Sequence, residues 1–129
     1  MTDYRKDSLF RQVVLSEEQL RAGLMQSVDG VPIPSEPIAM TSIGASELGV
    51  AARIEFQETF DDLDQGYFAI LEFGASFGVM LNEYLGSPMK GTRICTDPTG
   101  QHSRRRLEII LEALHLSYGQ LIWTIEGLE

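Results

Sequence analysis

The carboxylates in the middle of the chain are the side chains whose type and spacing point most clearly to a chemistry. Between Arg53 and Lys90 the sequence carries seven acidic residues and no lysine or arginine. They are Glu55, Glu58, Asp61, Asp62, Asp64, Glu72 and Glu83. In a chain of 129 residues with a formal net charge of −9, such a segment attracts cations and basic proteins and repels nucleic acid and anionic membranes. The sequence therefore predicts a surface for a basic partner.

A second charged cluster has the opposite sign. Arg104, Arg105 and Arg106 stand at the first turn of a predicted helix, where a cation opposes the partial positive charge of the helix end. Pairing with Asp97, with Glu108 or with the acidic segment would compensate that cost. The alternative is a contact between the guanidinium groups and an anion.

Most other chemistries are disfavoured. The two histidines and the single Cys95 do not form a zinc pattern, so we expect no metal and no cofactor. A nucleophilic Cys95 would need a neighbouring base and an activating positive environment. A carboxylate pair such as Glu55 with Glu72, or calcium at the Asp61 to Asp64 tip, is chemically conceivable but incomplete as a motif. We predict no catalytic residue and no enzymatic activity.

Length and composition predict one globular domain spanning residues 1–129. The hydrophobic share of 43% and the charged share of 22% are those of an ordinary folded protein. No stretch approaches the roughly 20 apolar residues that cross a bilayer, and the first fifteen residues lack a signal-peptide core. One cysteine fits a reducing compartment. These observations predict a cytoplasmic protein that binds neither membrane nor nucleic acid.

The first half of the chain predicts a mixture of elements. Residues 9–15 fit a first strand or an extended lead-in, and Ser16 with Gln19 forms a capping box for a helix running from Glu17 to about Val28. The prolines at 32, 34 and 37 predict an extended surface connection, followed by an edge strand over 38–43 and a small-residue turn over 44–49.

Strands dominate the next part. Apolar residues alternate from Val50 to Phe60 and predict a strand with one buried face, joined through the aspartate-rich loop to a strand over 67–73. Runs over 77–85 and 92–96 follow. Four strands in series predict an antiparallel meander, and the acidic loop is expected at its exposed tip.

The last part predicts a helix and a closing strand. Leu107, Ile110, Leu111 and Leu114 form an amphipathic stripe, and Leu121 to Ile125 is typical of a short strand that returns to the sheet. The expected fold class is α+β, with a single antiparallel sheet and two main helices packed on one face.

The carboxy-terminal third carries a resemblance to a known group of proteins. Glu83 to Pro88, Gly91 to Pro98, Leu111 to Leu114 and Trp123 resemble a pattern found in small acidic immunity proteins of bacterial polymorphic-toxin and contact-dependent inhibition systems. The resemblance implies a cytoplasmic protein that binds and neutralises one cognate toxin without catalysis. It transfers no particular binding residue.

Charge and resemblance together predict a toxin-neutralising binding protein. Carboxylates would complement a basic cleft, and two aromatic residues would supply apolar anchors. The expected partner-binding residues are Glu55, Glu58, Phe60, Asp61, Asp62, Asp64, Tyr67 and Glu72. Three alternatives stay open. The first is a regulatory or scaffold domain that self-associates through a sheet edge, and the second is a binder of a small anionic ligand at Arg104 to Arg106. The third is an enzyme with a pocket joining Arg93, Cys95, His102 and an acidic residue.

Overall fold

A computed structural model describes residues 10–16, 18, 27–28, 31–32, 34, 36–58, 66–73, 77–86, 88–96 and 104–125. Its strands are β1 (Arg11–Val13), β2 (Ser27–Val28), β3 (Val31–Pro32), β4 (Glu36–Thr41), β5 (Gln57–Glu58), β6 (Gly66–Phe73), β7 (Phe77–Tyr84), β8 (Thr92–Thr96) and β9 (Leu121–Thr124). Its helices are α2 (Ala45–Ala52), α3 (Arg104–Leu114) and the short 3₁₀ helix η1 (Tyr118–Gln120).

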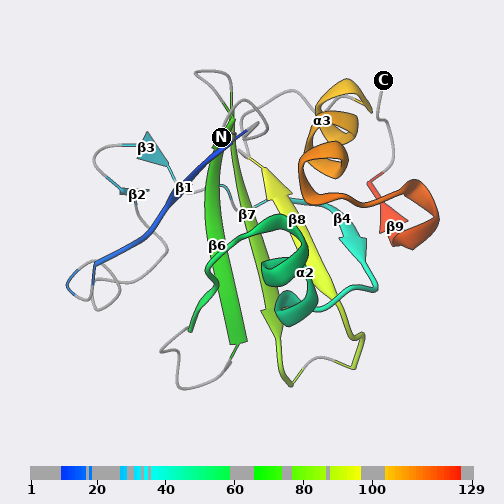
Figure 1. Ribbon diagram of the computed structural model, residues 1–129, viewed down its shortest axis with the longest axis horizontal. Helices are drawn as coiled ribbons and strands as arrows, with labels where there is room; N and C mark the ends of the chain where they lie inside the picture. The colour runs from blue at the N-terminus through cyan, green and yellow to red at the C-terminus, as the bar shows by residue number, and fades with distance from the viewer. Residues whose placement is uncertain are drawn as a thin grey trace.

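The fold is α+β, built on one antiparallel sheet of seven strands (Figure 1). The strand order is β1-β6-β7-β8-β4-β9, and β5 pairs with β6 on the same edge as β1. The predicted meander is present as β6, β7 and β8, whose ranges lie within one residue of the predicted ones. The strands β2 and β3 form a separate two-stranded ribbon.

The first prediction to fail concerns β4. The sequence predicted an edge strand over 38–43, but β4 runs between β8 and β9 as an inner strand. Pro37 was assigned to a surface connection and instead is the second residue of β4, opposite Cys95. The missing proline N–H is accommodated because the ladder shifts register between Pro37 and Ala39 and because β9 begins its pairing only at Ala39.

The second failure is α2, which replaces the predicted turn over 44–49 and the start of the predicted strand over 50–60. Ala45, Leu48 and Ala52 are buried at helical spacing, whereas Val50 is 82% exposed. The alternation that predicted a strand was therefore coincidental at its beginning. Among the described residues of that range, 50–58, only Gln57 and Glu58 are β-strand.

The described residues cover the second residue and the end of the helix predicted over 17–28. Glu18 is helical, and Ser27–Val28 is strand β2, so the predicted end at Val28 is wrong. The remaining residues of that helix, and the loop over 59–65, lie outside the described residues.

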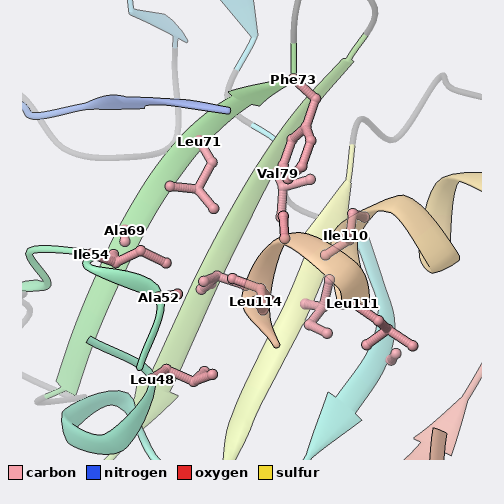
Figure 2. Packing of buried hydrophobic residues seen from close by; sticks show 14 of the residues in the cluster. Leu48, Ala52, Ile54, Ala69, Leu71, Phe73, Val79, Ile110, Leu111 and Leu114 are labelled. Carbon is pink, nitrogen blue, oxygen red and sulfur yellow. The ribbon is translucent and has the colours of Figure 1, made fainter. Parts of the chain in front are cut away.

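The two faces of the sheet contribute to two different hydrophobic clusters. The larger cluster joins alternate residues of β6 and β7, such as Leu71 and Val79, to Leu48 of α2 and Leu114 of α3 (Figure 2). The smaller cluster, on the opposite face, contains Leu15, Phe68 and Ile70. The predicted stripe of α3 is buried throughout, at Leu107, Ile110, Leu111 and Leu114.

Both helices end in the same way. Arg53 after α2 and His115 after α3 adopt left-handed backbone conformations with φ of 59°. The next amide in each case, Ile54 or Leu116, donates to the carbonyl five residues back, at 3.0 Å and 2.9 Å respectively. This is the Schellman arrangement, which satisfies carbonyls that the helix itself leaves without donors.

Candidate functional site

Half of the predicted partner-binding residues lie in the described part of the chain. Glu55 precedes β5, Glu58 ends it, and Tyr67 and Glu72 belong to β6. The other four, Phe60, Asp61, Asp62 and Asp64, lie outside the described residues.

The sheet register places Glu58, Tyr67 and Glu83 in one row. Glu58 of β5 lies opposite Tyr67 of β6, and Tyr67 lies opposite Glu83 of β7. Residues directly opposite one another in antiparallel strands project from the same face, with Cβ atoms about 5 Å apart. The half-buried tyrosine is therefore flanked on both sides by carboxylate residues.

Glu72 does not join this row. It lies five positions along β6 from Tyr67, so its side chain projects from the face that carries Phe68 and Ile70. There its Oε1 accepts hydrogen bonds from Arg11, with Nη2 at 2.6 Å and Nε at 3.2 Å. The structure thus separates Glu72 from Glu58 and Tyr67, and a cation of the chain itself compensates its charge.

Glu55 and Glu58 have no such compensation. Both residues are exposed, and in the described part of the chain no lysine, arginine or histidine lies within ion-pair distance of either. Their charges are therefore available to solvent and to any molecule that approaches this edge of the sheet.

Two glutamine side chains fix the segment that carries these glutamates. Gln12 of β1 donates from Nε2 to the carbonyl of Glu55 at 2.5 Å, and its Oε1 accepts from the Glu55 amide at 2.9 Å. Gln57 of β5 makes the reciprocal pair with Leu15, at 2.9 Å in each direction. The segment is held by hydrogen bonds to residues more than forty positions away in the sequence as well as by the sheet ladder.

Glu83 has a structural role that sequence reasoning missed. Its Oε1 accepts a hydrogen bond of 3.1 Å from the amide of Ala45, the first residue of α2. The N-cap residue, Gly44, offers no side chain for this purpose. A carboxylate at a helix N-terminus is favourable because it satisfies a free N–H and meets the positive end of the dipole. Since the two partners lie 38 positions apart, no local sequence pattern predicts the contact.

The arginine cluster is partly engaged within the chain. Arg105 lies 3.7 Å from Glu108, the pairing that the sequence offered as one compensation. The Arg106 guanidinium lies 4.9 Å from the centre of the Phe77 ring, which stacks on Phe73 at 5.0 Å. Arg104 is exposed. Two of the three cations thus have intramolecular contacts.

Cys95 lies in a setting that suppresses its reactivity. The residue is 2% exposed, and burial raises the pKa of its thiol to about 11, although Arg93 and the hydrogen bond from Asn82 act in the opposite direction. Asn82 Nδ2 lies 3.6 Å from the sulfur. A thiol with this pKa is protonated at neutral pH and is a poor nucleophile. His102, the third member of the hypothetical pocket, lies outside the described residues.

The described residues contain neither a cluster of metal-ligating side chains nor a helix that could span a membrane. No group of three or more histidine, cysteine, aspartate or glutamate side chains gathers among them in a way that could hold an ion. No helix within these ranges has the length and apolar character needed to cross a bilayer.

Comparison of the chain with protein-family models, with curated proteins and with solved structures finds no match.

Proposed function

We propose that this protein binds and neutralises a basic toxin domain, and that the outer edge of the sheet at β5 contributes to the binding surface. The observation that carries the proposal is the pair of exposed carboxylates, Glu55 and Glu58, that have no compensating cation in the described part of the chain. The formal net charge of −9 adds a negative electrostatic potential that attracts a basic partner from a distance.

The neighbouring aromatic residue strengthens the argument. Tyr67 lies directly beside Glu58 and is half-buried, so its ring is held in place while part of it faces outward. An amphipathic ring next to carboxylates that have no ion-pair partner among the described residues suits an arginine or lysine side chain. The carboxylate attracts such a side chain, and the ring can stack against it. In this proposal both helices lie on one face of the sheet and support it, and the protein acts in the cytoplasm without catalysis.

Toxins that cut nucleic acid supply a suitable partner chemistry. Their active sites bind phosphates through positive charges, and an acidic protein can occupy the same positions. Association would be fast at low salt, because long-range attraction steers the encounter, and would slow as salt screens the charges.

The test has a biochemical and a cellular part. The tagged chain is used to recover a binding partner from its source cells, and the partner is identified by mass spectrometry and then expressed in a host with and without this protein. We expect the partner alone to arrest growth and co-expression to restore it. A harmless partner, or growth that stays arrested on co-expression, would refute the proposal.

Two charge variants locate the surface. Glu55→Gln with Glu58→Gln removes two charges at the proposed site, and Glu108→Gln with Glu112→Gln removes two from exposed positions of α3. We expect the first pair to slow association with the recovered partner roughly tenfold at low salt, and the second pair to have a much smaller effect. Equal effects would show that net charge alone matters and that β5 is not the contact.

Self-association is the second candidate, favoured by the opposite edge of the sheet. The segment from Leu116 to Ile125 carries no charge, and Ile122 of β9 is 42% exposed. Two acidic copies could meet there without placing like charges in contact. The register shift of β9 against β4 shortens the regular edge that such pairing would use. Light scattering decides the case, because this candidate requires a dimer that Ile122→Lys disrupts.

A further inference from the structure

The outer edge of β6 is occupied by two separate segments in tandem. β1 pairs with Ile70 to Glu72, and β5 pairs with Phe68 and Tyr67. Figure 1 shows β1 beside the upper end of β6, from which the chain leads away to the left, whereas β7 lies to the right of β6. A strand of three residues and a strand of two residues each form few ladder hydrogen bonds, so neither has much stability of its own.

Near the point where they meet, the two segments enter different hydrophobic clusters, although Phe10 at the start of the first segment packs against the larger one. Leu15, just after β1, is 3% exposed and packs with Phe68 and Ile70. Ile54, just before β5, is 6% exposed and belongs to the larger cluster. The two segments therefore pass one another at the sheet edge on their way to opposite faces.

The glutamine bridges connect them at this crossing. The side-chain amide of each glutamine donates to the carbonyl of one residue and accepts from the N–H of the same residue. A peptide group pairs in the same way in a β-bridge. Gln12 bridges to Glu55, and Gln57 bridges to Leu15, so each segment supplies one glutamine and one main-chain partner. Both bridges run between the two segments and together contain four hydrogen bonds. If either segment opens, the other segment loses all four.

We propose that residues 10–16 and 54–58 form one cooperative unit that opens and closes as a whole, and that Gln12 and Gln57 are the residues that couple the two halves. The functional consequence rests on the proposed function. Because Glu55 and Glu58 lie in one half, release of the other half would also release the carboxylates from their fixed positions. The segment around β1 would then regulate binding without touching the partner, and a bound partner would reciprocally hold the segment closed.

Native-state hydrogen exchange tests the coupling in the whole chain without a partner. Gln57→Leu removes the hydrogen-bond acceptor of the Leu15 amide, so a change in exchange at Leu15 would follow from that loss alone. The Glu55 amide keeps its own acceptor on Gln12, and a change in its exchange therefore reports the coupling. Gln12→Leu reverses the roles, and its informative probe is the Leu15 amide. We expect each variant to lower the protection of its distant probe about tenfold. Unchanged protection of the distant probe in both variants would overturn the proposal.

A matched substitution controls for the loss of a glutamine as such. Gln120 accepts from the amide of Ser117 at 2.9 Å, in a turn next to β9. Gln120→Leu should leave the Leu15 and Glu55 amides as protected as in the unaltered protein. Exchange of the Leu81 amide in β7 reports global unfolding. If a leucine variant is globally unfolded, Gln57→Asn takes its place, because asparagine keeps the amide group on a side chain that is one methylene shorter.

Binding of the recovered partner tests the regulatory half. We expect Gln57→Leu to raise the dissociation rate several-fold while the salt dependence of association stays unchanged, because no charge is altered. Coupled exchange with unaltered dissociation would overturn the regulatory role. If the unaltered protein recovers no toxin, the proposed function fails while the exchange result still decides whether the unit is cooperative.

Discussion

The carboxylate of Glu83 on β7 accepts a hydrogen bond of 3.1 Å from the backbone N–H of Ala45, the residue that begins α2. The contact attaches the start of a short helix to the middle of the sheet. It also explains why one member of the acidic segment serves the fold, since this carboxylate is already engaged while Glu55 and Glu58 have no ion-pair partner among the described residues.

Removal of this carboxylate should destabilise the protein. We expect Glu83→Ala to lower the free energy of unfolding by about 1 kcal/mol, the usual cost of losing a helix N-cap acceptor. Glu83→Gln keeps an acceptor oxygen and should cost less. Urea denaturation followed by circular dichroism measures both, and equal stability of Glu83→Ala and the unaltered protein would show that the contact contributes nothing.

Gly91 should tolerate no side chain. Its φ is +135°, and a Cβ atom would lie 2.1 Å from the carbonyl oxygen of Thr41. We expect Gly91→Ala to cost about 3 kcal/mol or more, because both the backbone conformation and the packing must change. Gly86 has no atom within 4 Å of the corresponding position, so Gly86→Ala is the control and should change stability by less than about 1 kcal/mol. Thermal unfolding of the two variants gives the comparison.

The end of α3 offers a stabilising substitution. His115 has a φ of 59°, a conformation that glycine adopts without steric cost. We expect His115→Gly to raise the free energy of unfolding by about 0.5–1 kcal/mol. Glu112→Gly, inside the same helix, should lower it by about 1 kcal/mol. A loss of stability in His115→Gly would mean that the histidine side chain makes a contribution larger than the backbone strain.

Cys95 predicts a dependence of stability on pH. The thiol pKa rises from the ordinary 9.0 to about 11 on folding, so the folded state holds its proton more tightly than the unfolded state. The contribution of this thiol to the free energy of unfolding is complete below pH 9. As the pH rises from 9 to 11 the free energy of unfolding falls by about 2–3 kcal/mol in total. The difference in unfolding free energy between the unaltered protein and Cys95→Ala should shrink over this range. A constant difference from pH 8 to 11 would contradict the prediction.

The core of α3 gives the largest expected effect on the fold. Ile110 is fully buried, so Ile110→Ala should cost about 2–5 kcal/mol through lost burial and the cavity left behind. Ile109, its half-buried neighbour, is the matched control and should cost less when changed to alanine. Chemical denaturation of both variants tests whether the apolar stripe supports the domain as the packing indicates.

Local pattern was sufficient for α3 and for β6 to β8. The stripe of α3 was predicted because its buried residues repeat with the helical period, and the three strands were predicted as β-prone apolar runs separated by turn residues. α2 was missed because Ala45, Gly49 and their small neighbours resemble a turn, and because an accidental alternation began at Val50. The inner position of β4 depends on pairing with residues more than fifty positions away, which no local pattern encodes.

The candidate site was predictable in charge and unpredictable in geometry. The absence of lysine and arginine between Arg53 and Lys90 is visible in the sequence. The separation of Glu72 from them follows from the strand register, since an odd number of steps along β6 reverses the face. The Gln12 and Gln57 bridges join segments more than forty residues apart, and the spacing of the two glutamines in the sequence does not predict them.

The divided edge of β6 also bears on solubility. β6 is the most apolar long strand of the sheet, and an uninterrupted free edge along it would be a template for cross-β stacking between molecules. Two short strands that cross and diverge leave no straight row of amides and carbonyls for another chain to copy. Cells that accumulate this protein at high concentration would depend on that interruption, and variants that loosen it should form aggregates before they lose their helices.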